Sequence, residues 1–425
     1  MFTIAARCPD SRARRGTLHL ARGEVRTPAF VPLATRGAVK TLEPRDVSAL
    51  GYEMVLGNTF HLFLAPGQEL MAELGGLNEL MRWAAPIITD SGGFQVFSMG
   101  HGGVADEIKG RRGHPGNGSN AAKGGERGSG PAGPRGSTGT ILAIEEEGVR
   151  FRSYVDGSER FMGPETSMEM QAAIGSDIAL VLDECTPFHV SREYTARSME
   201  RTHRWLERCL DWHARYGPRP PRRQAVYGIV QGGVEHDLRM VSAATVAASR
   251  CDGIAIGGSL GQDKAQMYEV VDWSTAELER LAPDRPRHLL GIGEVDDLIA
   301  GVRYGIDTFD CAMPTRLGRH GVALVPDPGG RWRVDLVKGR WRRSPEPILD
   351  GCPCPACSAG FSRAYLHYLL RAGELTGLRL VTQHNLSFIA RLMEDLRTAI
   401  DQGKMTEMAA ALRAGAAPGA TSCTG

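Results

Sequence analysis

The stretch DIALVLDEC, residues 177–185, decides how the fold of this 425-residue chain is read. Residues 178–182 are all apolar, and two acids, Asp183 and Glu184, follow at once. A half-buried strand alternates apolar and polar residues, whereas an unbroken apolar run is expected when both faces of a parallel sheet are buried. The stretch therefore predicts a central strand with acids at its end.

Seven further stretches repeat this pattern along the chain, and most of the gaps between them are typical of helices. The segment 191–217 is amphipathic, with Ser191 as a plausible N-cap, and 261–281 is a second example. Eight strand–helix units predict an α/β fold, a (β/α)8 TIM barrel over residues 1–345, with catalytic groups at the strand C-termini. A doubly wound open sheet also fits this pattern. The seven stretches are TPAFVPLAT (27–35), EMVLGNTFH (53–61), PIITDSGGF (86–94), AVYGIVQGG (225–233), GIAIGGSLG (253–261), RHLLGIGE (287–294) and IDTFDCAMPTR (306–316).

Composition excludes several classes of protein. The chain has 50 Lys and Arg against 49 Asp and Glu, so contact with a nucleic acid must come from local basic clusters. No run of about 18 uncharged apolar residues is present, which argues against a membrane span, and the first residues lack a signal-peptide core. Nine cysteines, scattered except for three at 352–357, favour a cytoplasmic location with one metal site over a disulfide framework.

Two segments interrupt the strand–helix alternation. Residues 109–140 are rich in Gly, Ser and Pro, with six basic residues and one acidic, and are predicted to be a disordered surface insertion. This insertion either is solvated without a defined role or touches an RNA backbone. Near the C-terminus we predict a metal-binding subdomain over 346–384, a helix over 385–410 that packs back on the barrel, and a flexible tail over 411–425.

Three thiols and one imidazole predict the metal site. Cys352, Cys354 and Cys357 stand in GCPCPACS, and His384 follows after 26 residues. Such a set suits tetrahedral Zn2+, and four protein ligands make the ion structural rather than catalytic, one per subunit. Chance proximity of the thiols is the alternative. Spacing alone also leaves His367 available as the fourth ligand, although it lies in a helix-like apolar stretch.

Three aspartates follow predicted strands. A single Asp after a strand is usually a helix cap or a loop ligand, but the combination of Asp90, Asp183 and Asp310 indicates chemistry. Two carboxylates across a pocket are typical of displacement at an anomeric carbon. A purine base leaving ribose fits this reasoning, and arginines such as Arg316 would hold the flanking phosphates.

Several long motifs occur in order along the chain: LGNTFHL (56–62), TDSGGFQVFS (89–98), DECTPF (183–188), GIVQGG (228–233), FDCAMPTR (309–316) and the CPCPACS…H set. Through these motifs the chain resembles the bacterial tRNA-guanine transglycosylases (queuine tRNA-ribosyltransferase family) over nearly its whole length, except the 109–140 insertion and the tail. The resemblance implies a (β/α)8 barrel with a zinc module inserted before the last helix. It also implies exchange of guanine at wobble position 34 of tRNAs with GUN anticodons (Asp, Asn, His, Tyr) for preQ1, 7-aminomethyl-7-deazaguanine, in queuosine biosynthesis.

The same resemblance implies residue roles. Asp310 is the implied nucleophile at C1′ of the ribose, and Asp90 the general acid and base. Asp183 and Gln231 are expected to read the edge of the base, and the carbonyl of Ser259 to accept from the aminomethyl arm. The implied substrate-binding set is Asp90, Ser91, Gly92, Gly93, Phe94, Asp183, Gln231, Gly258, Ser259 and Leu290, with Phe94 and Leu290 sandwiching the ring. The implied RNA-binding set is Gly291, Glu294, Asp297, Thr315, Arg316 and Arg319.

Some features depart from the family pattern or leave alternatives open. GGSLGQD stands where relatives often carry GGLAVGE, which leaves the preference among preQ1, preQ0 and queuine open, although Cys185 favours a small arm. Glu294 replaces a lysine expected near RNA. Phe361, Tyr365 and Tyr368 match an aromatic cluster used for homodimers, and a plain buried helix face would explain them as well.

Two other functions compete with base exchange. A non-catalytic RNA-binding paralogue would be free to lose Asp310, which this chain keeps. A glycosidase acting on free sugars or nucleosides would have no need of Arg316 and Arg319.

Overall fold

Eight short parallel strands form the centre of the computed structural model, which describes residues 1–100, 141–219, 222–329 and 331–419. Each of the eight predicted stretches contains one of these strands, and every strand except the first is buried along its whole length. In sheet order they are β4 (Ala29–Val31), β14 (Thr308–Asp310), β13 (Arg287–Leu289), β12 (Gly253–Ile256), β11 (Ala225–Val230), β10 (Ile178–Leu180), β6 (Ile87–Thr89) and β5 (Val55–Gly57).

The two ends of this sheet meet, which makes the barrel nearly closed. Beyond β4 the chain continues alongside β5, where Leu33 and Leu56 form a parallel bridge. The backbone N–H of Leu56 donates to Pro32 O at 2.9 Å, and that of Ala34 donates to Leu56 O at 2.7 Å. An open doubly wound sheet would leave both edges unpaired, so that alternative is wrong and the predicted barrel is confirmed.

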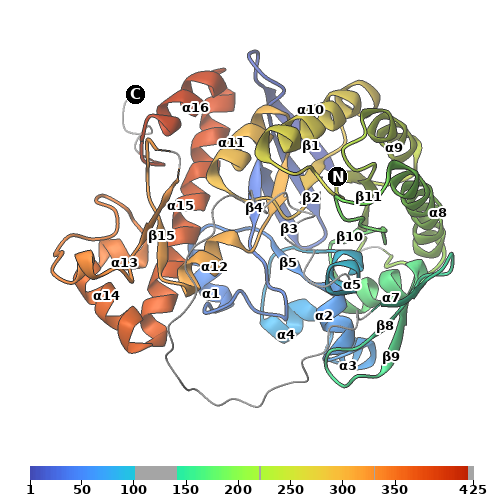
Figure 1. Cartoon of the computed structure of the whole chain (residues 1–425), viewed down its shortest axis with the longest axis horizontal. Coiled ribbons are helices and arrows are strands. Elements are labelled where there is room, and N and C mark those ends of the chain that lie inside the picture. The colour runs from blue at the N-terminus through green and yellow to red at the C-terminus, as the bar shows by residue number, and fades with distance from the viewer. Residues whose placement is uncertain (101–140, 220–221, 330, 420–425) are drawn as a thin grey trace, which may run out of the picture.

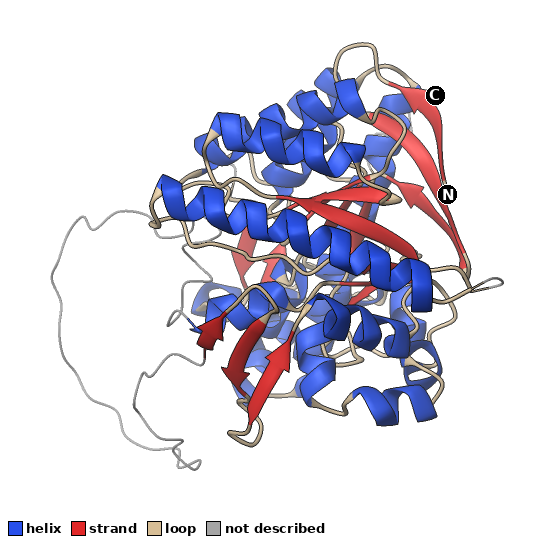
Figure 2. Cartoon of the chain, turned by 90° about the vertical axis from the view of Figure 1, so that its right-hand side faces the viewer, coloured by secondary structure: helices blue, strands red, loops and turns tan. Residues whose placement is uncertain are grey.

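Helices surround the strands (Figures 1 and 2). The predicted helix 191–217 is α8, and the Ser191 hydroxyl caps it by accepting from the backbone N–H of Tyr194 at 3.2 Å. The helices of the barrel are α1 (Pro44–Ala49), α2 (Thr59–Leu64), α3 (Gln68–Glu73), α4 (Leu77–Met81), α5 (Gly93–Gly100), α7 (Pro164–Ile174), α8 (Arg192–Tyr216), α9 (His236–Ala248), α10 (Lys264–Leu281), α11 (Val295–Arg303) and α12 (Met313–Arg319).

Two small antiparallel sheets are added to the barrel. The first, β1 (Phe2–Arg7), β2 (Arg14–Leu20) and β3 (Gly23–Thr27), precedes β4, and the second, β7 (Ile141–Ile144), β8 (Val149–Arg152) and β9 (Glu159–Met162), lies between α5 and α7. Arg14 of β2 reaches Asp307, the residue before β14, at 2.6 Å, and neither side chain is exposed. A buried ion pair of this kind ties the first sheet to the barrel at the N-terminal ends of the strands, away from the predicted site.

The C-terminal module follows α12 and lies at the left of Figure 1. It contains the hairpin β15 (Val322–Leu324) and β16 (Arg333–Asp335), the 3-10 turn Gly339–Trp341, α13 (Pro355–Ser358) and α14 (Arg363–Ala372). Helix α15 (Leu375–Asp401) then runs back along the barrel, and α16 (Met405–Arg413) ends the described helices. Any Cβ at Gly318 of α12 would collide with the hydroxyl and the backbone of Thr382, so the backbones of α12 and α15 approach closely at this crossing.

The structure changes two of the predicted boundaries. The division between residues 384 and 385 falls inside α15, which is continuous, so one helix serves both the module and the barrel. Residues 411–419 do not form the expected tail: Leu412 of α16 is buried, and the backbone N–H of Gly419 donates to Asp395 at 2.6 Å. The helix reaches this far because an apolar face of α16 packs on α15. Residues 420–425 lie outside the described residues.

The predicted insertion 109–140 also lies outside the described residues. Within the described part of the chain, no helix combines the length and apolar character needed to cross a membrane.

Candidate active site

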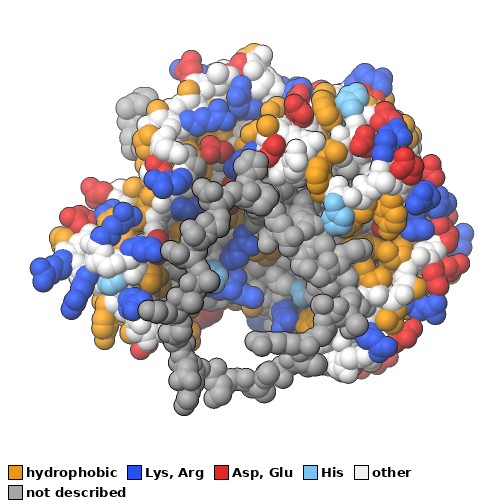
Figure 3. Space-filling view, viewed as in Figure 1, with side chains coloured by type: hydrophobic (Ala, Val, Ile, Leu, Met, Phe, Trp, Pro, Cys, Tyr) orange, Lys and Arg blue, Asp and Glu red, His pale blue; other side chains and the backbone are white. Residues whose placement is uncertain are grey.

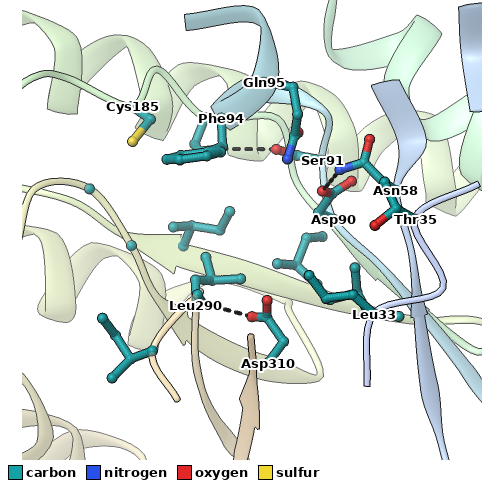
Figure 4. Close-up of a pocket in the computed structure, with 18 of the residues that line it drawn as sticks. Leu33, Thr35, Asn58, Asp90, Ser91, Phe94, Gln95, Cys185, Leu290 and Asp310 are labelled. Atoms are coloured by element: carbon teal, nitrogen blue, oxygen red, sulfur yellow. Dashed lines mark hydrogen bonds between the residues drawn. The ribbon is translucent and has the colours of Figure 1, made fainter. Parts of the chain in front are cut away.

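The C-terminal ends of the barrel strands surround one cavity of about 200 Å3 (Figure 4). Asp310 enters it from β14 and Asp90 from the residue after β6, and Asp183 follows β10 by three residues. The polar residues that end parallel strands meet here because all eight strands run in the same direction. The lining residues are Leu33, Thr35, Leu56, Asn58, Asp90, Ser91, Phe94, Gln95, Leu180, Asp183, Cys185, Ile229, Gly257, Gly258, Leu260, Leu290, Gly291, Ile292 and Asp310.

Asp310 is held through one of its two carboxylate oxygens. The backbone N–H of Gly291 donates to Oδ1 at 2.9 Å, and the ring nitrogen Nε2 of His288 lies 3.2 Å from the same oxygen. His288 is fully buried, and its other ring nitrogen, Nδ1, is 2.9 Å from the hydroxyl of Thr308. Among the described residues no hydrogen bond to Oδ2 of Asp310 is formed, so that oxygen remains available to a ligand.

Asp90 is bound by the loop that follows β5. The backbone N–H of Thr59 donates to Oδ1 at 2.8 Å, and the side-chain amide of Asn58 donates to Oδ2. Asn58 is itself the N-cap of α2, accepting from the backbone N–H of His61 at 3.0 Å. The motif LGNTFHL therefore serves to fix the carboxyl of Asp90.

Burial raises the pKa of Asp90 to about 7, and the charge of Asp310 adds to the rise, while the hydrogen bond from Thr59 opposes it. A carboxyl group with a pKa near neutrality can both accept and give a proton at physiological pH.

Asp183 is held at both oxygens. The Ser91 hydroxyl donates to Oδ1 at 2.9 Å, and the side-chain amide of Gln231 donates to Oδ2 at 2.6 Å. Burial raises the pKa of Asp183 to about 6, against the effect of these two hydrogen bonds. Asp183 therefore presents an acceptor in a defined orientation at the wall of the cavity.

Apolar side chains line facing walls of the cavity. Phe94 and Leu290 lie on opposite sides in Figure 4, and Cys185 lies near Phe94. Leu260 contributes a further apolar surface. A slot with apolar walls and polar groups at its edges suits a flat heterocycle.

Four residues of the predicted substrate-binding set are not among those that line the cavity. Gly92 and Gly93 allow close packing instead, because a Cβ at either position would press on Met162 or on the backbone of Asp183. The side chain of Gln231 lies beside Gly258 and donates to Asp183, so it orients the carboxylate.

Ser259 is the fourth of these residues, and its carbonyl already has a partner. The guanidinium of Arg239 donates to this oxygen at 2.9 Å and also to the carbonyls of Gly233 and Gly257. Arg239 is fully buried, so it holds the turn after β12 from behind. The neighbouring residue that lines the cavity is Leu260.

The predicted RNA-binding arginines lie on α12, directly after Asp310. Arg316 is exposed and Arg319 is half-buried, and within the described chain neither forms an ion pair with an acidic side chain. Thr315 is buried, and its hydroxyl donates to Ala312 O at 3.1 Å. Gly291 lines the cavity.

The two predicted RNA-binding acids are engaged within the protein. Glu294 pairs with Arg333, which partly offsets its negative charge at this surface. Asp297 is buried and lies 2.9 Å from the ammonium of Lys264, and it accepts from the hydroxyl of Tyr268 at 2.8 Å. Glu294 therefore links the barrel to β16 of the C-terminal module, and Asp297 links α11 to α10.

The cysteine–histidine set is assembled as predicted. The ligand atoms of Cys352, Cys354, Cys357 and His384 lie within 4.8 Å of one another, and all four residues are buried. Nδ1 of His384 is 3.8, 3.3 and 3.5 Å from the three sulfurs in chain order. Tetrahedral coordination at usual zinc bond lengths places sulfur and nitrogen about 3.6 Å apart, so this set fits a metal ion.

The second ring nitrogen of His384 fixes the orientation of the imidazole. Nε2 lies 2.7 Å from the carbonyl oxygen of Leu324, so it donates there and leaves Nδ1 free to bind a metal. His367 is not part of the cluster: its Nδ1 lies 2.9 Å from Leu336 O. The choice between the two histidines, which spacing left open, is settled in favour of His384.

Comparison with known proteins places the chain in a family. A family model described as queuine tRNA-ribosyltransferase matches residues 8–113 and 135–417. The chain belongs to the queuine tRNA-ribosyltransferase family. A protein of this name from Roseiflexus sp. (strain RS-1) is 47% identical over 417 residues, which covers 96% of this chain and 98% of the relative. Relatives of the same name from Pelotomaculum thermopropionicum and Pseudomonas putida are 41% and 42% identical, covering 96% and 93% of this chain.

Membership of the queuine tRNA-ribosyltransferase family confirms the resemblance and makes this chain an enzyme of the transferase class. Sequence reasoning nevertheless missed two residues of the site. His288 stands in the short buried strand β13, where a histidine gives no signal of function, and Gln95 follows Phe94 in a helix start. Only the folded barrel brings His288 to Asp310 and Gln95 to the cavity.

We expect Asp90→Asn to change the pH dependence of stability. The pKa of Asp90 is about 7 in the folded state, above its ordinary value of 3.8, so the folded protein binds the extra proton between these pH values. Stability contributed by this group is therefore lost as pH rises from about 4 to about 7. Asparagine does not ionise, so Asp90→Asn avoids the loss of stability that the parent undergoes as pH rises. The free energy of unfolding of Asp90→Asn relative to the parent should therefore increase by roughly 2–4 kcal/mol between pH 5 and pH 8. Urea denaturation at both pH values measures this, and an unchanged difference would contradict it.

Proposed function

We propose that this enzyme exchanges guanine at wobble position 34 of tRNAs with GUN anticodons (Asp, Asn, His, Tyr) for preQ1, a step of queuosine biosynthesis. The observation that carries the proposal is the cavity in which Asp90 and Asp310 meet between two apolar walls, in a chain of this family. A nucleotide turned out of the anticodon loop would place its base between Phe94 and Leu290.

In the first half of the reaction Asp310 attacks C1′ of the ribose. A bond forms between a carboxylate oxygen and C1′ while the bond from C1′ to N9 of guanine breaks, and the electron pair passes to the purine. Asp90 delivers a proton to the departing guanine, for which a pKa of about 7 is suitable. Oδ2 of Asp310 is the attacking oxygen, because the backbone N–H of Gly291 donates to Oδ1 and Nε2 of His288 lies 3.2 Å from Oδ1.

In the second half preQ1 takes the place of guanine. Its N9–H proton passes to Asp90, N9 attacks C1′, and the bond between C1′ and the Asp310 oxygen breaks with its electron pair returning to the carboxylate. Two displacements at one carbon give net retention of configuration. The resting protonation states of both aspartates are restored.

Asp183 would select a guanine-like base. Its carboxylate accepts hydrogen bonds, so it suits the N1–H and 2-amino donors of guanine and preQ1, which adenine does not present in that arrangement. The small residues Gly257 and Gly258 and the thiol of Cys185 leave room for the aminomethyl arm of preQ1. Leu260 narrows the cavity beside this turn, which disfavours the bulkier arm of queuine.

Arg316 and Arg319 would bind phosphates of the anticodon loop, since α12 starts three residues after Asp310. The ion in the cysteine–histidine cluster is proposed to be Zn2+, one per subunit, with a structural role, because three thiolates and an imidazole prefer zinc. We also propose a cytoplasmic enzyme and a homodimer. Tyr365 and Tyr368 of α14 and Leu375 of α15 are exposed apolar residues, and Phe361 stacks on Tyr365 with ring centroids 5.4 Å apart.

Replacement of Asp310 by Asn tests the nucleophile. We expect Asp310→Asn to abolish exchange of labelled guanine in tRNA, and to eliminate the tRNA–protein adduct on a denaturing gel, because an amide does not displace the base. Asp211→Asn, at an exposed acid of α8 outside the cavity, is the control and should keep the adduct. An adduct that persists in Asp310→Asn would assign the nucleophile elsewhere, and exchange without any adduct would exclude the covalent route.

His288 is proposed to position Asp310. We expect His288→Leu, which removes the ring nitrogen near Oδ1, to slow adduct formation about 10- to 100-fold with little change in the KM for tRNA. His288→Gln keeps an N–H donor and should recover much of the loss. Equal rates in both variants and the parent would show that the histidine only fills space. Single-turnover gel assays separate this effect from tRNA binding.

Loss of the metal should act on the fold before the chemistry. We expect one zinc ion per chain by elemental analysis, and about none in Cys354→Ser. Because the cluster stabilises the module, Cys354→Ser should lower the thermal unfolding temperature, and its activity should fall with the folded fraction. Activity lost while the melting curve stays unchanged would contradict a structural role.

A further inference from the structure

Residues 338–343, KGRWRR, form a basic surface on the C-terminal module that the site described above does not use. Lys338, Arg340, Arg342 and Arg343 are all exposed, and Trp341 is half-buried between them. In the sequence, two acids flank these four cations, Asp335 before them and Glu346 after them. We call residues 338–343 the basic turn. In Figure 3, Lys and Arg side chains project at the left edge of the molecule, where Figure 1 places this module.

The arginines of the basic turn lack acidic partners. Within the described chain, the guanidinium groups of Arg340, Arg342 and Arg343 form neither an ion pair nor a hydrogen bond. The two acids nearby are already engaged: Asp335 lies 3.6 Å from Lys338, and Glu346 accepts from the hydroxyl of Ser344. The basic turn thus carries uncompensated positive charge.

Several exposed arginines elsewhere in the protein are paired with acids, whereas others, such as Arg152, Arg222 and Arg316, form no ion pair within the described chain. Arg204 bonds Glu146 at 2.7 Å, Arg250 lies 2.7 Å from Asp211, and Arg280 lies 2.6 Å from Glu277. Arg340, Arg342 and Arg343 differ from these single arginines because they lie within four consecutive positions of the chain, and a concentrated positive patch of this kind attracts a polyanion.

Contacts of Trp341 and backbone hydrogen bonds hold the basic turn in place. The indole N–H of Trp341 donates to Asp335 O at 2.8 Å, and the guanidinium carbons of Arg340 and Arg363 lie 4.6 and 4.9 Å from its ring centroid. Backbone bonds from Ser344 to Trp341 and from Ala364 to Ser344 tie the turn to the start of α14. A fixed backbone reduces the conformational entropy that binding would cost.

We infer that the basic turn binds the sugar–phosphate backbone of the tRNA substrate outside the nucleotide that enters the cavity. The inference rests on the proposed function for the identity of the RNA. The chain passes from Arg316 and Arg319 through the β15–β16 hairpin directly to this turn, so both basic groups belong to one continuous segment. The guanidinium groups of Arg340 and Arg363 cover the ring of Trp341. The basic turn itself therefore offers no apolar side chain for insertion into a lipid surface, and a phosphate backbone is the polyanion that fits it.

The test compares two variants with matched charge loss. Arg340→Gln/Arg342→Gln/Arg343→Gln removes the unpaired charges, and Arg82→Gln/Arg250→Gln/Arg280→Gln removes three exposed arginines that are paired with acids. We expect the first variant to raise the Kd for full-length tRNA roughly tenfold or more at low salt. Each phosphate contact contributes about 0.9 to the slope of log K against log salt, so this slope should fall by roughly 2–3. The control variant should keep both values.

The double variant Arg342→Gln/Arg343→Gln leaves the stacking of Arg340 on Trp341 intact, and should show a smaller loss of the same kind. Unchanged affinity and salt slope in the triple variant, with normal guanine exchange by the parent protein, would overturn the inference. The inference would also be overturned if the triple variant changed the oligomeric state, or if it lost binding to phosphatidylglycerol vesicles but not to tRNA. A parent protein that exchanges no guanine would instead refute the proposed function, while the binding data would still report on the surface.

Discussion

The structure depends on the hydrogen-bonded closure of eight parallel strands. Each strand is only three to six residues long, and its apolar side chains face either the barrel interior or the surrounding helices. Closure through Leu33 and Leu56 leaves no free edge, so the backbone groups of these strands are satisfied inside the barrel. Because the strands are parallel, the residue after each one arrives at the same mouth. Asp90, Asp183 and Asp310 come together for this reason, although 220 residues separate the first from the last.

The site concentrates acids in a place where burial opposes their ionisation. Burial raises the pKa values of Asp90 and Asp183 to about 7 and about 6, and the hydrogen bonds around each carboxyl group only partly oppose this effect. Such an arrangement reduces stability and prepares the carboxyl groups for proton transfer and for recognition of a base. Opposite the site, the buried pair of Arg14 and Asp307 serves the fold alone. The two ends of the barrel thus separate chemistry from structural support.

Helix α15 links the metal cluster to the cavity. His384 lies in its middle, and Thr382 packs against Gly318 of α12, the helix that carries Arg316 and Arg319. The carbonyl of Leu324 in β15 holds the imidazole of His384, which connects the hairpin to the same helix. A structural ion in this cluster would therefore keep α12 in position beside Asp310, even though it lies outside the cavity. This coupling explains how a module without catalytic groups belongs to the working enzyme.

The amino-acid sequence by itself determined the eight strands, the helix capped by Ser191, the three cysteines of the metal cluster and the family, because apolar runs, cap residues and ordered motifs are local signals. Only the tertiary structure decided what depends on neighbours distant in sequence. It joined Gln231 to Asp183 and Arg239 to the carbonyl of Ser259, brought His288 to Asp310, paired Glu294 with Arg333 and carried α15 through the predicted boundary at 384. Side-chain partners across a closed barrel are set by packing in three dimensions, and no periodicity along the chain records them.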